Sequence, residues 1–290
     1  MSLLKYQIFV KVVEVGSLTK VGEMLKLTQS AISHAISGLE HELGLTLLIR
    51  SRSGIKLTDN GERLLHHFKE IIQLNEKLHQ EVALIKGLEI GTVRIGTFSS
   101  VSIQWLPRLL KEYHDQFPLI EAKLLDGNYH EIENWIVSGE VDFGFVNAPT
   151  QEGLEVIPLK NDRMLCILPS NHVLREQSII RLEQIVDLPF IMPVAGCDID
   201  VLRIFSQHKL SPKIQYEVED DHAIMSMVQH GLGVSILPEM ILSQTQYDLC
   251  IRPLDGEHSR SIGIAAVSFK NVSPAAKKFI DFIAARVDKL

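Results

Sequence analysis

The sequence predicts a mainly α-helical N-terminal domain, a single long helix and a C-terminal α/β domain. Two short helical patterns joined by a tight turn lie between residues 17 and 43. A heptad-like apolar repeat follows over residues 58–86, and strand and helix signals alternate from residue 92 onward. A chain of 290 residues with 46% hydrophobic residues is long enough for two or three domains, each with its own core.

The first two helical patterns have recognisable starts. The hydroxyl of Ser17 or Thr19 can cap the first helix, and that of Thr28 can cap the second, because each can accept a hydrogen bond from a free backbone N–H. Apolar residues then recur at helical spacing in the second helix and predict one buried stripe. This stripe consists of Ile32, Ile36, Leu39 and Leu43.

The polar face of the second helix carries short hydrogen-bonding side chains instead of the Lys and Glu that are typical of a solvated face. Gln29, Ser33 and Ser37 are spaced four apart, as are Ser30 and His34, so they form two adjacent rows. Such groups can approach base edges in a major groove. The alternative is an ordinary helical hairpin, which this composition disfavours. The predicted DNA contacts of this helix are Thr28, Gln29, Ser30, Ser33, His34 and Ser37.

Residues 47–57, LLIRSRSGIKL, predict two short strands around a Ser-Gly turn. This hairpin would form a wing beside the second helix, and Arg50 and Arg52 could reach phosphates or the minor groove. The alternative is a plain solvated hairpin. Together, these patterns predict a winged helix-turn-helix domain over residues 1–58.

Residues 59–88 predict one long helix whose apolar residues alternate in steps of four and three. A helix packed on its own domain would show a broader apolar face, so the pattern favours a dimerisation helix. Asn75 is the single polar residue of the seam and would fix the register of a paired coil. A linker follows at Gly87. The predicted seam consists of Leu64, Phe68, Ile71, Asn75, Leu78, Val82 and Ile85.

The C-terminal part, residues 89–290, predicts α/β units around largely parallel sheets, because strand and helix patterns alternate with short turns. The pattern continues to a final helix over residues 273–290. Its first elements are strands at 92–98, 120–127 and 141–146 and helices at 102–118 and 130–139.

The strongest candidate for a ligand site is the turn GTFSS, residues 96–100, between a predicted strand and a predicted helix. Free backbone N–H groups and the positive dipole end of a helix favour an anion such as a carboxylate. Other segments at strand ends could meet this turn, because open α/β sheets bind ligands there. The alternative for each residue is an ordinary cap or turn. The candidate effector-binding residues are Thr97, Ser99, Ser100, Asn147, Gly196 and His222.

Other functions have little support. The sequence contains no H-E-x-x-H, G-x-S-x-G or Walker motif and its histidines are scattered, so we expect no catalysis, metal site or cofactor. Cys166, Cys197 and Cys250 form no C-x-x-C pair. A redox role for Cys197 is disfavoured relative to an inert thiol, because no resolving partner is evident. The lack of a membrane-spanning apolar run and of a signal peptide predicts a cytoplasmic protein without membrane contact.

The net charge of −7 is unevenly distributed. Residues 1–57 contain seven Lys or Arg and four acidic residues, which gives +3 and leaves −10 for the remainder. A basic N-terminal domain joined to an acidic remainder is expected where only the N-terminal domain contacts DNA phosphates. Because +3 is modest, tight DNA binding would require at least two copies.

Three segments resemble the LysR-type transcriptional regulators. TQSAIS at residues 28–33 matches the family pattern S-Q-P-A-V-S, and LEHELG at 39–44 with LLIR at 47–50 matches L-E-x-x-L-G-x-x-L-F-x-R. Ser30 stands where Pro is usual, Leu48 where Phe is usual, and Val21-Gly22 where two alanines are common. These departures keep every predicted base-contacting group, although Gly22 lowers helix propensity. A looser resemblance covers the C-terminal two-thirds.

The resemblance implies a sequence-specific transcriptional regulator whose promoter binding is modulated by a small-molecule effector. It implies a periplasmic-binding-protein-like domain with one subdomain at about 89–161 and 265–290 and a second at about 162–264. The chain would cross between them near Leu159–Arg163 and Arg252–Ile262. The implied partners are promoter double-stranded DNA, a small-molecule effector, RNA polymerase and further copies of the chain in a homodimer or homotetramer. The turn at residues 96–100 favours an anionic effector.

Two other classes of protein are open. A cytoplasmic solute-binding or transport-linked protein with an accessory N-terminal domain would differ in failing to retain DNA at moderate salt. An α/β enzyme is disfavoured by the missing motifs, and a screen for turnover would decide.

Overall fold

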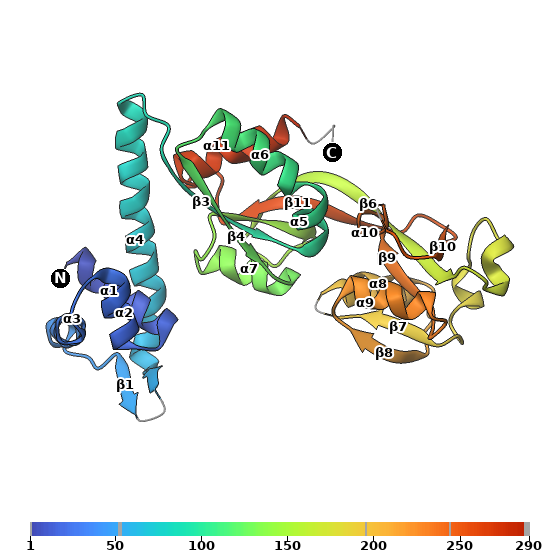
Figure 1. The fold of residues 1–290 in the computed structure, drawn as a ribbon, viewed down its shortest axis with the longest axis horizontal. Helices are drawn as coiled ribbons and strands as arrows, with labels where there is room; N and C mark the ends of the chain where they lie inside the picture. Colours follow the sequence, from blue (N-terminus) through green and yellow to red (C-terminus); the bar gives the residue numbers. More distant parts are fainter. Residues whose placement is uncertain (1, 52–53, 195, 244, 287–290) are drawn as a thin grey trace. The chain divides into compact units, whose positions relative to one another are not determined.

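The computed structural model describes residues 2–51, 54–194, 196–243 and 245–286. The chain divides into two compact units (Figure 1). The first contains Met1–Gly91 with the short segment Ser138–Glu140, and the second contains Thr92–Val137 and Val141–Leu290. No helix in the described ranges is long and apolar enough to cross a membrane.

The first unit is a winged helix-turn-helix domain that continues into a long helix. Thr28 Oγ1 accepts a hydrogen bond from the Ala31 N–H at 3.1 Å, and this interaction caps the second helix of the motif. The two strands of the wing pair antiparallel. The elements are α1 (Leu3–Val15), α2 (Leu18–Leu25), α3 (Gln29–Leu43), β1 (Leu48–Ser51), β2 (Gly54–Leu57) and α4 (Asp59–Ile85).

Gly22 lies where α2 meets the turn before α3. A Cβ atom at this position would lie 2.7 Å from the carbonyl oxygen of Leu27 and 3.4 Å from the backbone nitrogen of Gln29. The missing side chain therefore lets α2 contact the backbone of the turn directly. This close packing explains a glycine that the sequence alone presents only as a loss of helix propensity.

The first half of α4 packs on its own domain. Phe68 is 4% exposed, stacks on Tyr6 with ring centroids 4.7 Å apart and meets Phe9 edge-on at 5.3 Å. Leu64 is half-buried against the same core. We therefore correct the prediction that Leu64 and Phe68 lie on a dimer seam, because the core of the N-terminal domain occupies their side of the helix.

The second unit contains two subdomains, and the first is built on a mixed sheet covered by helices. Its strands, in spatial order, are β4 (Ile120–Asp126), β3 (Gly91–Thr97), β5 (Phe143–Ala148), β11 (Ser259–Ala266) and β6 (Glu155–Pro169). Its helices are α5 (Ser99–Gln104), α6 (Leu106–Gln116), α7 (Tyr129–Val137) and α11 (Pro274–Ala284).

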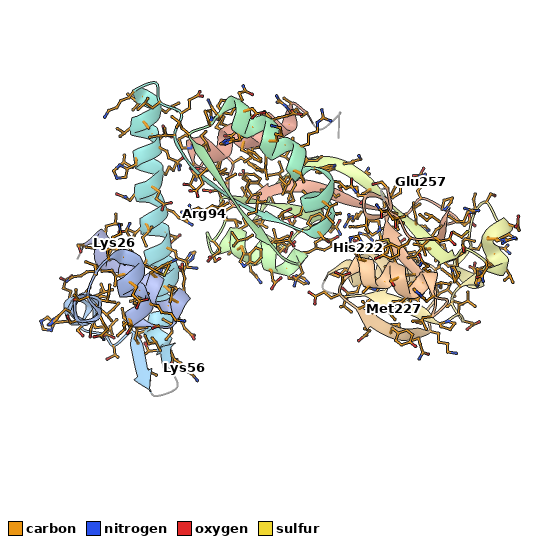
Figure 2. The ribbon with its side chains drawn as sticks, in the orientation of Figure 1. Lys26, Lys56, Arg94, His222, Met227 and Glu257 are labelled. Carbon is orange, nitrogen blue, oxygen red and sulfur yellow. The ribbon has the colours of Figure 1, made fainter. Side chains whose placement is uncertain are left out.

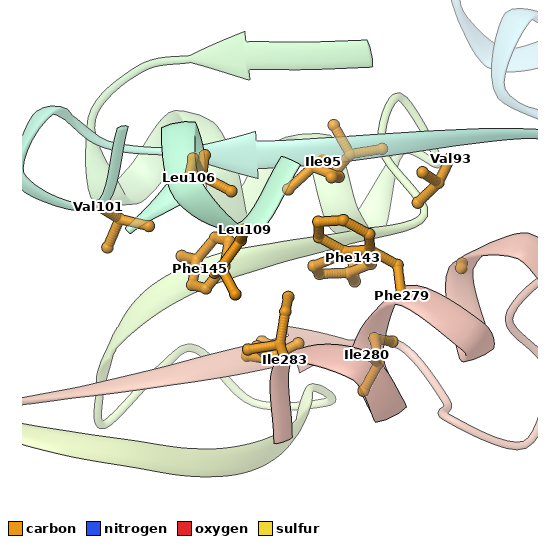
Figure 3. Close-up of a cluster of buried hydrophobic side chains, with 14 of the residues drawn as sticks. Val93, Ile95, Val101, Leu106, Leu109, Phe143, Phe145, Phe279, Ile280 and Ile283 are labelled. Atoms are coloured by element: carbon orange, nitrogen blue, oxygen red, sulfur yellow. The ribbon is translucent and has the colours of Figure 1, made fainter. Parts of the chain in front are cut away.

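A core of aliphatic and aromatic side chains holds this subdomain together (Figure 3). Ile95 of β3 and Phe143 of β5 meet Phe279 of α11, and all three are fully buried. The last helix therefore returns to the first subdomain, as the sequence resemblance implies.

The second subdomain uses the far half of β6. Residues Met164–Ile167 of this strand pair with β9, and Leu165–Pro169 pair with β10, so one 15-residue strand serves both subdomains. The other strands are β7 (Phe190–Pro193), β8 (Ile214–Val218), β9 (Ser235–Pro238) and β10 (Leu249–Pro253). The helices are η1 (Val173–Glu176), η2 (Leu182–Gln184), α8 (Cys197–Gln207), α9 (Asp221–Gln229) and α10 (Glu239–Leu242).

The sheets are mixed, which differs from the largely parallel arrangement that we predicted. β3 pairs parallel to β5 and β7 parallel to β8, but β6, β9, β10 and β11 form antiparallel pairs. The reason is that β6 and β11 connect the subdomains in opposite directions. β11 begins at Ser259, so the expected boundary between residues 264 and 265 falls inside a strand of the first subdomain.

Candidate functional site

The polar residues predicted on α3 form one accessible face. Gln29, Ser30, His34 and Ser37 are exposed and Ser33 is half-buried, whereas Ile32, Ile36 and Leu39 on the opposite side are fully buried. The hydroxyls of Thr28 and Ser30 are 2.9 Å apart, so Ser30 also takes part in the start of the helix. The structure thus brings the five predicted residues of α3, together with Thr28 that caps the helix, to one solvent-facing surface.

Several residues on or near this surface were not among the predicted contacts. Ala31 and His41 of α3 are exposed, and His41 extends the row that contains Ser37. Lys26 ends α2 and Lys56 lies on the wing strand β2, and both are exposed (Figure 2). Both lysines contribute to the +3 charge of residues 1–57, but neither was predicted to contact DNA.

Some lysines of the domain are paired with carboxylates and others are not. Lys5 binds Glu42 at 2.6 Å, and this hydrogen bond holds the pKa of the Glu42 carboxyl below its usual value. Lys11 binds Glu14 at 2.9 Å. Within the described ranges, no carboxylate oxygen lies within 4.0 Å of Lys26 or Lys56, so both remain available to phosphate.

The wing arginines fall at the edge of the described chain. The backbone of Arg50 pairs with Ile55 in the wing hairpin. The Arg50 side chain and the whole of Arg52 lie outside the described residues.

The second half of α4 presents an apolar stripe to solvent. Leu74, Leu78 and Ile85 are 67%, 60% and 83% exposed, and Ile71 and Val82 are also exposed. Asn75 is half-buried beside them. Leu74 was absent from the predicted seam, although its spacing from Leu78 and Ile71 fits a heptad.

In the second unit, the turn between β3 and α5 contacts the crossing strand β11 and helix α9 of the other subdomain. Ser100 is 1% exposed, and its Oγ accepts a hydrogen bond from Nη2 of Arg260 at 2.7 Å. The exposed Ser99 donates from Oγ to Oδ2 of Asp221, 3.4 Å away at the start of α9. Thr97 is buried, and its hydroxyl lies 3.1 Å from that of Ser102. α5 has only six residues, because the predicted single helix breaks at Trp105.

Asn147 at the end of β5 forms a second bridge between the subdomains. Its Nδ2 donates to Oδ2 of Asp200 on α8 at 2.8 Å, and its Oδ1 accepts from the Ser261 N–H at 3.2 Å. Asp200 is fully buried and binds Nη2 of Arg203 at 2.7 Å. Burial raises the pKa of the Asp200 carboxyl, against the opposing effects of the Asn147 hydrogen bond and Arg203. Both the nitrogen and the oxygen of the Asn147 side-chain amide are thus already hydrogen-bonded within the protein.

Gly196 and His222 complete the predicted set. Gly196 is buried at the start of α8 with a φ of 105°, and a Cβ there would lie 3.1 Å from the ring of Tyr129 in the first subdomain. His222 is exposed, with its ring 6.1 Å from that of Tyr247, whereas its neighbour Asp221 makes the contact with Ser99. The structure therefore brings Ser99, Ser100, Asn147 and Gly196 to the junction of the subdomains. Thr97 instead contacts Ser102 within the first subdomain, and the His222 side chain lies beside the junction.

The charged centre of this junction was not predicted from the sequence. Arg260 of β11 and Asp162 of β6 form a buried ion pair, and Arg260 also donates to the hydroxyl of Tyr129 at 2.7 Å. The two residues are 98 positions apart, so no local pattern could link them.

Metal and thiol chemistry have no candidate in the described part of the chain. No group of three or more His, Cys, Asp or Glu is placed there to hold a metal ion. Cys166 and Cys250 are buried, and burial raises the pKa of the Cys166 thiol, which disfavours the reactive thiolate. The side chain of Cys197 lies outside the described residues.

Both units match known protein families. The model of the bacterial regulatory helix-turn-helix protein, lysR family, matches residues 3–62, and that of the LysR substrate binding domain matches residues 86–288. YvbU of Bacillus subtilis, described as an uncharacterized HTH-type transcriptional regulator, is 37% identical over 284 residues, which cover 97% of each chain.

Solved structures share the fold over almost the whole chain. Full-length OxyR from Pseudomonas aeruginosa superposes with a TM-score of 0.78 at 21% identity, covering 99% of this chain and 94% of that one. Full-length CbnR in complex with its target DNA superposes with a TM-score of 0.59 at 21% identity, covering 99% and 100% of the two chains.

Proposed function

This chain belongs to the LysR family of bacterial transcriptional regulators, and from that premise we propose which of its residues read DNA, pair two copies and bind an effector. Its first unit is the DNA-binding domain of a transcriptional regulator and its second is an effector-binding domain. The family, fold class and general function that the sequence predicts are therefore confirmed.

α3 is proposed as the recognition helix, and the observation that carries this assignment is its exposed face of short, uncharged polar side chains. Gln29 and Ser33 would read base edges, with Ser30, His34 and Ser37 beside them. Arg50 and Arg52 of the wing, together with Lys56, would hold phosphates and thereby fix the register of the helix.

Two copies would pair through the second half of α4. Its apolar stripe of Ile71, Leu74, Leu78, Val82 and Ile85 is exposed in a single chain and is covered when two such helices form a coiled coil. Asn75 within the stripe would set the register. A dimer, or a tetramer built from dimers, would supply the two DNA-binding domains that the modest charge of each domain requires.

The effector would bind where the two subdomains meet, at the turn that contains Ser99 and Ser100. Gly196 lies close to the same junction through Tyr129. An acidic group of the effector would be repelled at Ser99, because the Asp221 carboxyl already contacts that residue. We therefore assign the acidic group to the hydroxyl of Ser100, which Arg260 polarises. Asn147 and Asp200 would act by holding the subdomains together, and a ligand with different affinity for two arrangements would shift DNA binding.

The test is capture of genomic DNA fragments by the full-length protein at moderate salt, followed by footprinting. We expect protected promoters in which half-sites are separated by whole helical turns and are bound far more tightly than random DNA. A solute-binding protein or an enzyme would retain no specific fragment. The neighbouring genes would indicate candidate effectors, and addition of the true effector should shift the footprint.

We further propose that the protein has no enzymatic activity and works in the cytoplasm, where its promoter DNA and RNA polymerase are found. The missing catalytic motifs support the first point. Incubation of the purified protein with each candidate effector should leave that molecule chemically unchanged.

A further inference from the structure

Glu40, an acidic residue near the end of α3, ties the recognition helix to the wing. Its side-chain Oε1 accepts hydrogen bonds from the backbone N–H groups of Leu47 at 2.8 Å and Leu48 at 3.1 Å. Its backbone carbonyl accepts from the N–H groups of Gly44 and Leu45. One residue thus satisfies most of the free donors in the turn from α3 to β1.

The amides that the Glu40 side chain holds lie at the base of the wing. Leu47 and Leu48 are 0% and 5% exposed, so their side chains anchor this segment in the core of the domain. The carbonyl of Leu47 accepts from the Thr58 N–H at 3.0 Å, immediately before α4. The first residues of the wing are therefore fixed between Glu40 on one side and the start of α4 on the other.

The charge of Glu40 points to a geometric role. A carboxylate on a DNA-binding domain weakens the positive potential that attracts phosphate. Among the other acids of residues 1–57, Glu14 and Glu42 offset their charge against Lys11 and Lys5. The Glu40 carboxylate instead accepts hydrogen bonds from two uncharged backbone N–H groups. Hydrogen bonds to a charged acceptor are stronger than those between neutral groups.

We propose that Glu40 is a positioning residue for DNA recognition. It touches no DNA in this proposal and instead holds strand β1, which contains the backbone of Arg50, in a fixed orientation to the polar face of α3. The inference rests on the proposed DNA-binding roles of α3 and the wing. Strand β1 begins at Leu48, so one of the two backbone N–H groups that Glu40 binds belongs to the first residue of the strand.

Two substitutions in the full-length protein separate geometry from charge. Glu40→Gln removes the charge and keeps an Oε1 acceptor, whereas Glu40→Ala removes both. Glu14→Ala serves as the control, because it removes one negative charge from α1 and leaves the wing untouched. The probes are a DNA fragment captured by the wild type and a random-sequence duplex of equal length, each titrated at two salt concentrations.

We expect Glu40→Ala to bind the captured fragment about tenfold more weakly than the wild type, since two backbone donors at the base of the wing lose their acceptor. Glu40→Gln should bind as tightly as the wild type or more tightly, and so should Glu14→Ala. If all three variants bind both DNA probes more tightly and to the same extent, Glu40 acts only as a surface charge and the proposal is overturned.

Amide hydrogen exchange tests the contact without DNA. The amides of Leu47 and Leu48 should exchange faster in Glu40→Ala than in Glu40→Gln, while the amide of Ile36 in the core of α3 stays protected in both. Unchanged protection of Leu47 and Leu48 in Glu40→Ala would refute the proposal. If the wild type captures no specific fragment, the DNA-binding assignment fails, and this exchange measurement still decides whether Glu40 holds the wing.

Discussion

Arg260 and Asp162 form a buried ion pair between β11 and β6, the two strands that connect the subdomains of the effector domain. Nε and Nη2 of Arg260 donate to Oδ2 of Asp162 at 2.9 and 2.7 Å, and the side chains are 1% and 2% exposed. Oδ1 of Asp162 accepts from the Met240 N–H at 3.0 Å. Since the same guanidinium binds Ser100, this pair fixes the turn at which we place the effector.

Arg260→Met should strongly destabilise the effector domain, because Asp162 would be left buried without its counter-charge. We expect the free energy of unfolding to fall by about 3–5 kcal/mol. Trp105 and Trp135, the two tryptophans of the chain, both lie in the second unit, so their fluorescence during urea unfolding reports on this domain.

Arg163→Met is the matched control, since Arg163 neighbours Asp162 in sequence but forms an exposed pair with Glu239 at 2.8 Å. This change should have a much smaller effect on the urea midpoint. Addition of Asp162→Asn to Arg260→Met should recover part of the loss, because it removes the buried charge. Equal destabilisation by Arg260→Met and Arg163→Met would show that the buried ion pair contributes no more to the stability of the domain than the exposed pair does.

Gln29→Ala should reduce sequence-specific binding and leave non-specific binding nearly unchanged. The exposed Gln29 amide can form a bidentate contact with a base, and its loss should cost about 1–3 kcal/mol of discrimination. Lys56→Ala is the comparison, because loss of a phosphate contact should weaken binding to all sequences and lower the salt slope by about one. Fluorescence anisotropy with captured and random duplexes measures both. Wild-type affinity of Gln29→Ala for the captured site would place the reading face elsewhere.

Leu78→Lys should dissociate the paired copies and abolish tight binding to a full operator. Leu78 is 60% exposed in the single chain, and a charge at the centre of the stripe on α4 would oppose its burial in a coiled coil. Leu84→Lys introduces the same charge at an exposed residue on another face of α4, and it should leave the assembly intact. Sedimentation gives the oligomeric state. A Leu78→Lys protein that sediments like the wild type would exclude this stripe as the pairing surface.

The DNA-binding domain could be predicted in detail because its signals are local. A capping hydroxyl at Thr28, an apolar stripe and a row of polar residues all lie within one helix. The extent of the α4 seam could not be predicted in the same way. The heptad pattern runs without interruption from Phe68, which is buried in the domain, to Leu78, which is exposed, so the pattern does not show where packing within the chain ends.

The junction of the subdomains was predicted only in outline. The GTFSS turn follows from its place at the end of a strand, but Arg260 and Asp162 meet only because two distant strands cross. At the start of α9, the residue that we predicted from the sequence was His222. In the structure Asp221 contacts Ser99 instead, and the spacing of residues along the chain does not show which of two neighbouring side chains meets a segment 122 positions away.

Asp221 is expected to make the effector domain less stable as the pH rises. Burial raises the pKa of its carboxyl, and the nearby Arg260 and the Ser99 hydroxyl offset only part of this effect. In the unfolded chain an Asp side chain has a pKa of about 3.9. Between that value and the raised pKa, the folded protein keeps a proton that the unfolded chain has released. The contribution of Asp221 to stability is therefore complete at low pH and is lost as the pH rises through the raised pKa.

Asp221→Asn should remove this dependence, because an amide at residue 221 does not titrate and its oxygen can still accept from Ser99. Urea unfolding followed by tryptophan fluorescence, repeated from about pH 4 to 7.5, measures the free energy of unfolding of both proteins. The value for the variant should rise relative to that of the wild type as the pH rises, and the difference should become constant above the raised pKa. Asp115→Asn, at an exposed carboxylate paired with Lys111, is the control and should give a curve parallel to that of the wild type. If the curves of Asp221→Asn and the wild type are also parallel, the Asp221 carboxyl titrates alike in the folded and unfolded chains, and the prediction is wrong.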